Sequence, residues 1–205
     1  MTISKILLSG LAVSALAIAA PATAKIATGS NVSDMTVVDS NGTTHKLSDF
    51  AGKKVVLEWT NEGCPYVKKH YTTDNMQKTQ KMATTDGAVW LSIISSAPGK
   101  QGYKSGEEAN AWKKAQDAKS TAVILDEEGT MGKTFAAKTT PHMYIIDESQ
   151  TLVYQGAIDD NRSASPSTVA GAKNYVLAAM DDLKAGRAVA ESDTPPYGCS
   201  IKYKS

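Results

Sequence analysis

The sequence predicts an α/β domain in which a central mixed β-sheet is flanked by helices. Short apolar runs of strand length alternate with charged segments of helical propensity along most of the chain. The run at residues 88–95 is apolar nearly throughout, as is typical of a strand buried on both faces. Without its first 24 residues the chain keeps 181 of 205 residues, which is enough for one domain with its own core and too few to suggest two.

The first elements are predicted to be a hairpin and then a central strand. Asn41-Gly42 is the strongest short-range hairpin signal, and an apolar run of strand length follows at residues 54–59. Residues 65–82 carry their apolar side chains at a spacing more helical than extended. Thr72-Thr73-Asp74 is a candidate interruption of that helix.

The rest of the chain continues the alternation and adds a strand-helix insertion. Residues 88–95 are predicted as a strand, and a loop rich in glycine and proline leads from it to a helical segment at 107–119. The remaining predicted elements are a strand at 122–126, a short helix at 129–138, two strands within 142–158 joined by a four-residue turn, and a closing helix from about Pro166 to Gly186.

Residues 1–24 have the pattern of a secretory signal peptide. Lys5 is followed by an apolar stretch that ends at Ala20, and Ala22-Thr23-Ala24 is a small-residue cleavage site. The stretch is shorter than the roughly 20 residues that a membrane-spanning helix needs. We therefore expect export to the periplasm, cleavage after Ala24 and no stable membrane anchor. The predicted organisation is a signal peptide at 1–24, a domain at 25–190 and a C-terminal tail at 191–205.

Charge and cysteine content narrow the function classes. The chain has 22 basic and 21 acidic residues, and removing the signal peptide takes away only Lys5, so the mature net charge is zero. A neutral chain is not typical of proteins that bind nucleic acid or anionic membranes. Cys64 and Cys199 are the two cysteines, and in an oxidising compartment an even count favours pairing.

Several segments, in order, resemble thioredoxin-like proteins of the exported TlpA and peroxiredoxin-like (AhpC/TSA-type) redoxin groups. The likeness covers residues 32–186 and is most specific at Cys64, straight after a strand, and at Thr140-Pro141, where such proteins place a cis proline beside the active thiol. It is strongest to a peroxiredoxin-like subgroup that pairs NEGCPYVKKHY, here residues 61–71, with a terminal GCSIK, here 198–202. The resemblance implies a thioredoxin-like fold and thiol redox chemistry without a cofactor.

The position of Cys64 favours a chemical role independently of that resemblance. A thiol at a helix N-terminus faces unpaired N–H groups and the positive end of the helix dipole, which favour the thiolate. Lys68 and Lys69 add positive charge within one turn. We therefore expect the pKa of Cys64 to lie below the free value of roughly 8.5. The alternative is an inert buried cysteine or one half of a structural disulfide.

The chain departs from both groups that it resembles. The positions at which a peroxiredoxin carries proline, threonine or serine, and arginine are Leu57, Asn61 and Pro141 here. The Asn61 amide could still bind the peroxide, but Arg162 or a lysine would have to stabilise the departing oxygen. A thioredoxin or TlpA protein uses a second cysteine where this chain has Val67, so dithiol exchange within the motif is excluded.

Two further sites remain open from the sequence. Cys199 lies in a tail rich in turn formers and either resolves an intermediate on Cys64 or forms a permanent disulfide with it. His142 follows Pro141 and could approach Cys64, as in related copper carriers, although this chain offers one motif cysteine and less certain positions for His45 and His70.

The sequence thus predicts an exported thiol oxidoreductase in which the Cys64 thiolate attacks a peroxide or a protein disulfide. Cys199 is the candidate resolving thiol, and a thiol donor would return electrons. The supporting residues are expected to be Asn61, Gly63, Lys68, cis Pro141 and Arg162, with no metal. The alternatives are a non-enzymatic binding or structural module with a permanent disulfide, or a copper carrier.

Overall fold

The computed structural model describes residues 26–32 and 34–204. The predicted signal peptide, residues 1–24, lies outside the described residues. None of the helices in the described part of the chain combines the length and apolar character that crossing a membrane requires.

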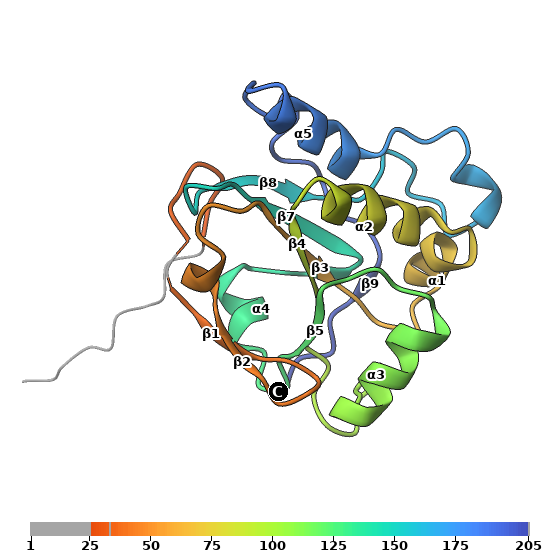
Figure 1. Ribbon diagram of the computed structural model, residues 1–205. Helices are drawn as coiled ribbons and strands as arrows, with labels where there is room; N and C mark the ends of the chain where they lie inside the picture. Colours follow the sequence, from red (N-terminus) through yellow and green to blue (C-terminus); the bar gives the residue numbers. More distant parts are fainter. Residues whose placement is uncertain (1–25, 33, 205) are drawn as a thin grey trace, which may run out of the picture.

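A five-stranded mixed sheet forms the centre of the domain, as the sequence predicts (Figure 1). Its strand order is β5-β4-β3-β7-β8. β3 runs parallel to β4, and β4 runs parallel to β5, whereas β7 is antiparallel to both β3 and β8. The bounds are β3 Val55–Trp59, β4 Val89–Ile94, β5 Ala122–Leu125, β7 His142–Ile146 and β8 Leu152–Gly156.

Helices cover one face of the sheet, and the N-terminal segment with one short helix covers the other. The first face packs against α1 (Pro65–Thr72), α2 (Asn75–Thr85), α3 (Gly106–Ala115) and α5 (Tyr175–Lys184). The second face packs against α4 (Thr130–Thr134), the hairpin of β1 (Thr36–Val38) and β2 (Thr44–Lys46), and the 3-10 turn η1 (Leu47–Phe50). In Figure 1, α2 and α5 lie on the opposite side of the sheet from α4 and the hairpin.

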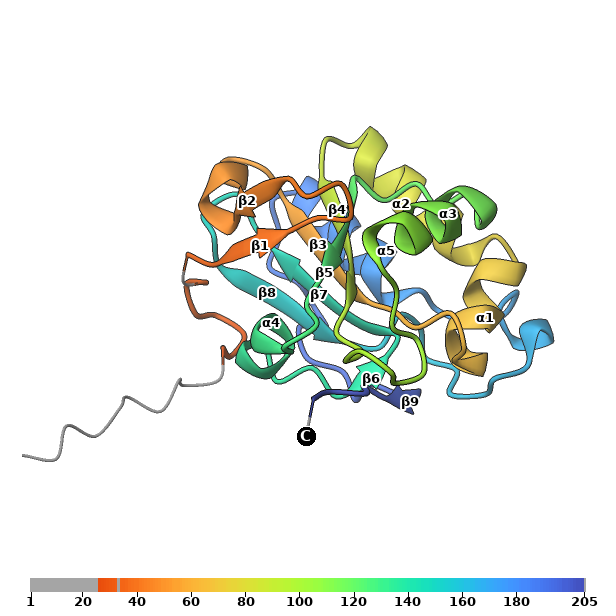
Figure 2. The ribbon, with the colours of Figure 1, turned by 90° about the horizontal axis from the view of Figure 1, so that it is seen from below.

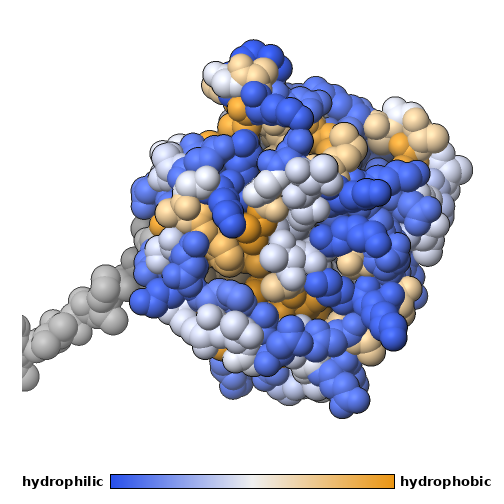
Figure 3. Space-filling view, in the orientation of Figure 1, coloured by the Kyte–Doolittle hydropathy of each residue, from blue (hydrophilic) through white to orange (hydrophobic). Residues whose placement is uncertain are grey.

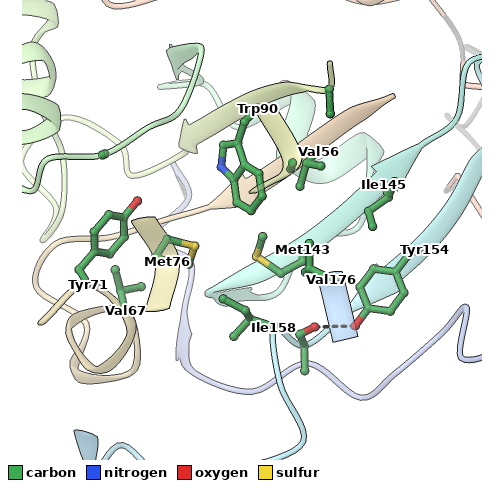
Figure 4. Close-up of a cluster of buried hydrophobic side chains, with 14 of the residues drawn as sticks. Val56, Val67, Tyr71, Met76, Trp90, Met143, Ile145, Tyr154, Ile158 and Val176 are labelled. Atoms are coloured by element: carbon green, nitrogen blue, oxygen red, sulfur yellow. Dashed lines mark hydrogen bonds between the residues drawn. The ribbon is translucent and has the colours of Figure 1, made fainter. Parts of the chain in front are cut away.

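The two apolar clusters follow from the alternation of side chains along the buried strands. In β3, Val56 belongs to the helical side, whereas Leu57 belongs to the side of the hairpin. Figure 4 shows the helical side, where Met76 of α2 and Met143 of β7 point toward each other beside Trp90. Hydrophilic residues cover most of the face seen in Figure 3, and hydrophobic residues show mainly in the hollows between them.

A predicted turn and a predicted helix break both occur where the sequence places them. The hairpin turns at Asn41-Gly42, with Gly42 in the left-handed region at φ 79°. The helical segment after Cys64 breaks between Thr72 and Asn75, where Asp74 has φ 58°. The break separates α1, which begins beside Cys64, from α2.

The closing helix begins later than the sequence predicts. Pro166 starts only a 3-10 turn, η2 (Pro166–Thr168), and α5 begins at Tyr175. The reason is a competing pairing: Asp160 N–H donates to Lys173 O, and Tyr175 N–H donates to Ile158 O, which keeps residues 173–174 extended. Asn174 then caps α5 by accepting the N–H of Leu177 at 3.0 Å.

The C-terminal tail returns to the domain and adds a second small sheet. β9 (Cys199–Ser200) pairs antiparallel with β6 (Thr139–Thr140), the strand immediately before Pro141. Figure 2 shows β6 and β9 side by side near the C-terminus. Thr194 and Tyr197, which precede β9, are buried. The tail is therefore packed into the domain rather than lying loosely on its surface.

Candidate active site

Cys64 occupies the N-cap position of α1, directly after the central strand. Its backbone is extended, with φ −81° and ψ 123°, and Pro65 supplies the first helical residue. Its carbonyl oxygen accepts the N–H groups of Val67 and Lys68, and its side chain is fully buried. The thiol thus lies at the positive end of the helix dipole, as the sequence predicts.

The two thiols meet although 135 positions separate them in the sequence. Cys64 Sγ lies 2.7 Å from Cys199 Sγ, and both cysteines are free thiols. The pairing of β6 with β9 explains the meeting, because Thr140 is the direct partner of Cys199 and its carbonyl oxygen lies 3.1 Å from Cys64 Sγ. The Thr140–Pro141 peptide bond is cis. Only a small movement separates the sulfur atoms from the roughly 2.05 Å of a disulfide.

Hydrogen bonds make Cys64 the more acidic thiol. Burial raises the pKa of Cys64, but hydrogen bonds from Cys199 and from the backbone of Val67 oppose burial, and the pKa of Cys64 is lowered. The pKa of Cys199 rises to about 11, because of its partial burial and its hydrogen bond and charge interaction with Cys64. Cys64 is therefore the more acidic of the two thiols, and Cys199 the less acidic.

The two lysines after Cys64 are not among the main contributions to its lowered pKa. Lys68 is exposed, and Lys69 is buried with its ammonium group 2.8 Å from Asn161 O and 3.3 Å from Asp159 Oδ2. The Lys69 ammonium also lies 5.5 Å from the centre of the Tyr197 ring. Lys69 thus joins α1 to the tail, and the main contributions that lower the pKa of Cys64 are hydrogen bonds.

A buried polar network continues from Lys69 and fixes the tail beside α1. The hydroxyl of Tyr197 donates to Asp159 and lies 3.2 Å from His70 Nε2, whose Nδ1 lies 2.8 Å from Asn75 Nδ2. Burial lowers the pKa of His70 to about 4, since this cost exceeds the opposing charge of Asp159. His70 is therefore neutral at physiological pH, and the network anchors the tail two residues before Cys199.

Asn61 holds the loop in front of Cys64. Its Oδ1 accepts the N–H of Gly63 at 2.9 Å, and its Nδ2 donates to Gln101 O and Gln101 Oε1 at 3.2 and 3.0 Å. A Cβ on Gly63 would lie 1.9 Å from Gln101 Nε2, so a side chain there would displace the end of the Gln101 side chain. Asn61 and Gly63 thus lie next to Cys64, and their contacts join α1 to the loop that precedes α3.

Two other residues singled out from the sequence make no hydrogen bond to the Cys64 sulfur in the described part of the chain. Arg162 is exposed, and the contacts of the Cys64 sulfur are made by Cys199 and Thr140. His142 is buried on the other side of β7, and its Nδ1 accepts the N–H of Lys138 at 3.2 Å. No group of three His, Cys, Asp or Glu side chains that could hold a metal ion occurs within residues 26–32 and 34–204.

Sequence reasoning missed the place of four residues in this site. Lys69 is expected from the sequence to act on Cys64, and Asp159 lies in a charged run typical of a solvated turn, yet each is almost completely buried because the other neutralises it. Thr140 was noted only as the neighbour of Pro141, although its hydroxyl is buried without a hydrogen-bond partner in the described part of the chain. The signal that could have identified Tyr197 is its spacing of two residues from Cys199.

The sheet, the cis proline and the buried thiol pair define a thioredoxin-like protein, and the thiols make it a thiol-dependent oxidoreductase. The chain belongs to the redoxin family, because the Redoxin family model matches residues 27–176. This match confirms the family that the sequence resembles. No curated protein is a significant match to the chain.

Solved structures share the fold at low sequence identity. A hypothetical protein from Sinorhizobium meliloti 1021 has a TM-score of 0.74 and 22% identity, over 89% of this chain and 97% of its own. An uncharacterised conserved protein from Geobacillus kaustophilus has a TM-score of 0.74 and 24% identity, over 87% and 93%. A putative protein disulfide isomerase from Bacteroides thetaiotaomicron has a TM-score of 0.55 and 15% identity, over 81% and 92%.

Proposed function

We propose that this chain is an exported thiol peroxidase in which Cys64 reacts with peroxide and Cys199 resolves the product. The observation that carries the proposal is the 2.7 Å separation of the two sulfur atoms, with Cys64 the more acidic. Export rests on the signal-peptide pattern of residues 1–24.

The reaction follows from the different acidities of the two thiols. The Cys64 thiolate attacks one oxygen of the peroxide, the O–O bond breaks, and the other oxygen leaves as alkoxide or hydroxide and takes up a proton. Cys64 becomes a sulfenic acid. Cys199 then attacks the Cys64 sulfur, giving a disulfide and one water molecule. Two electrons have passed from the thiols to the peroxide, and an external thiol donor would restore them.

Burial of Cys64 favours a small substrate. Its side chain has no exposed surface, and Cys199 of the tail lies against it. A peroxide needs a far smaller opening than a protein disulfide does. Arg162 is exposed, and the contacts of the Cys64 sulfur are made by Cys199 and Thr140, so the buried Thr140 hydroxyl is the group that we expect to stabilise the departing oxygen.

Exchange with a protein disulfide is the second candidate, and the pairing of β6 with β9 favours it. Thr139 and Thr140 bind an extended, cysteine-bearing strand of this chain next to Cys64. A cysteine-bearing strand of another protein could take the same place after the tail moves aside. The Cys64 thiolate would then attack that protein's disulfide, and Cys199 would release the mixed disulfide.

Intact-mass measurement tests the proposed peroxidase. Reduced protein treated with one equivalent of hydrogen peroxide should become lighter by two hydrogen atoms, and Cys199→Ser should instead gain one oxygen atom or over-oxidise. Cys64→Ser should be unchanged and serves as the control. A wild-type protein that over-oxidises as the Cys199→Ser variant does would remove Cys199 from the mechanism.

The reduction potential separates the enzyme from a structural module. A permanent structural disulfide should have a reduction potential below roughly −300 mV, and a catalytic disulfide should have a higher one. A disulfide that resists mild thiols would therefore overturn the proposal. Activity with peroxide but not with a protein disulfide would exclude the second candidate.

A further inference from the structure

The tail lies against the backbone of Thr140 and Pro141 at a position where residue 198 has no side chain. Gly198 has φ 134°, a conformation that side-chain-bearing residues rarely adopt. A Cβ at this position would lie 2.1 Å from Thr140 O and 3.3 Å from Pro141 N. Both atoms belong to the backbone, so they could not rotate away as the end of a flexible side chain does.

The tail is fixed on both sides of Gly198. On one side the hydroxyl of Tyr197 donates to Asp159, and its ring packs edge-on against Tyr66 at 5.8 Å between centroids. On the other side Ile201 N–H donates to Lys138 O at 3.1 Å. Because both ends are held, a side chain at residue 198 would push β9 away from Thr140, and Cys199 would move with it.

We propose that Gly198 is the positioning residue that brings Cys199 Sγ to Cys64 Sγ, by letting β9 lie directly against Thr140-Pro141 in one fixed register. This inference deepens the proposed function, on which it rests for the role of Cys199. Gly198 does not touch the reacting atoms and acts only through the place that it gives to Cys199.

The same close approach recurs elsewhere along the tail. Gly156 in β8 has φ 146°, and a Cβ there would lie 2.2 Å from Thr194 Oγ1. A Cβ on Gly132 of α4 would lie 2.3 Å from the Tyr203 hydroxyl oxygen. The tail thus packs against a glycine of the domain before β9 and against another after it. These two contacts support a fixed position of the tail on the domain, of which the Gly198 contact is one part.

Gly198→Ala, compared with Gly186→Ala, tests the proposal. Gly186 also has a positive φ, 69°, but no atom lies within 4 Å of a Cβ built there, so its variant carries backbone strain without the clash. Reduced protein is mixed with oxidised glutathione. The Cys64 thiolate attacks one glutathione sulfur and releases one glutathione, and Cys199 then attacks the Cys64 sulfur and releases the second together with its own proton. Quenching followed by mass spectrometry times both steps.

The second step should become slower in Gly198→Ala by about 10²-fold, the effect expected for a misplacement of about 1 Å. Gly186→Ala should match the wild type. The pH profile of Cys64 alkylation should also shift upward in Gly198→Ala alone, since the hydrogen bond from Cys199 is lost; a merely structural role would leave this profile unchanged. Equal rates in Gly198→Ala and wild type would overturn the proposal.

Moving the thiol by one residue tests the register even if Gly198→Ala does not fold. Ser200 pairs with Thr139 and is exposed, so the double change Cys199→Ser with Ser200→Cys keeps the composition of β9. In a fixed strand the new thiol faces away from Cys64 and should leave the mixed disulfide with glutathione unresolved. Resolution at the wild-type rate would show a loose tail and overturn the proposal.

The outcomes for Gly198 and for the proposed function are separable. A wild-type protein that resolves the glutathione adduct quickly but does not reduce peroxide or a protein disulfide would refute the proposed function and leave the role of Gly198 intact. A peroxidase whose Gly198→Ala variant resolves as fast as the wild type would refute the role of Gly198 alone.

Discussion

Thr140 stands opposite Cys199 in the pairing of β6 with β9, and its carbonyl oxygen lies 3.1 Å from Cys64 Sγ. Its hydroxyl is buried and has no hydrogen-bond partner in the described part of the chain. A buried hydroxyl without a partner is costly, so a thiolate or a departing oxygen beside it would satisfy an unmet donor.

Replacing Thr140 should therefore change the acidity of Cys64. Thr140→Val keeps the shape and removes the donor, so the pKa of Cys64 should rise, whereas Thr140→Ser keeps the donor and should leave the pKa close to that of the wild type. The rate of iodoacetamide alkylation of Cys64 against pH, in reduced protein, measures the shift. Coincident profiles for the valine variant and the wild type would contradict the prediction.

The two thiols should react at different pH. The pKa of Cys64 is lowered and that of Cys199 is raised to about 11, so Cys64 carries the larger thiolate fraction at neutral pH. Site-resolved alkylation of the reduced wild-type protein at pH 7 should label Cys64 first. Unfolded protein, in which the two sites should react alike, is the control. Faster labelling of Cys199 in the folded protein would refute the assignment.

Removing the Tyr197 hydroxyl should loosen the tail. Tyr197→Phe removes the hydrogen bond to Asp159 and the contact with His70 Nε2, which should lower the free energy of unfolding by about 1–3 kcal/mol. Tyr175→Phe, which removes a half-buried tyrosine hydroxyl on α5, is the matched control and should cost less. Urea unfolding of the reduced proteins compares them. Equal stabilities would show that the network does not hold the tail.

The buried histidines should make the protein less stable in mild acid. Burial, with a smaller effect from Lys138, lowers the pKa of His142 to about 3, and the pKa of His70 is about 4, whereas the unfolded chain binds these protons near pH 6.5. The unfolded state therefore binds more protons below pH 6.5. Stability should be fully present above that pH and fall toward pH 4, by at most about 1.4 kcal/mol per pH unit for each histidine.

His142→Asn tests the contribution of one of these groups. Its Oδ1 can still accept the N–H of Lys138, but the side chain no longer titrates. The free energy of unfolding, measured in urea between pH 7 and pH 4.5, should fall less steeply in the variant. The difference in slope should correspond to the uptake of about one proton fewer on unfolding, which is at most about 1.4 kcal/mol per pH unit. A slope equal to that of the wild type would show that His142 is already protonated in the folded protein.

The local signals in the sequence were sufficient for most elements of the fold. The turn at Asn41-Gly42, the buried strands and the break at Asp74 each depend on residues close together in the chain, and each occurs as predicted. The start of α5 does not, because Lys173 and Tyr175 pair with residues 158–160. Pro166 correctly marks a helical turn, but the longer-range pairing at residues 173–175 keeps α5 from starting before Tyr175.

The site was predictable only in part, for the same reason. Cys64 and Pro141 follow from local motifs and a family resemblance. The burial of Lys69 and Asp159 depends on a partner some 90 positions away, so each charge alone resembles a solvated one. The geometry that joins Cys64 to Cys199 likewise depends on a two-residue strand, β9, which is too short to carry a periodic pattern.

The late position of β9 in the chain sets an order of assembly. Cys64 leaves the ribosome 135 residues before Cys199 does, which at typical synthesis rates is an interval of roughly 7 to 27 s. During that interval α1 and the first strands can form, but the nascent chain does not yet contain the strand that covers the thiol. A chain that stops before residue 199 would therefore carry a cysteine that attacks foreign disulfides and has no internal thiol to release the resulting mixed disulfide.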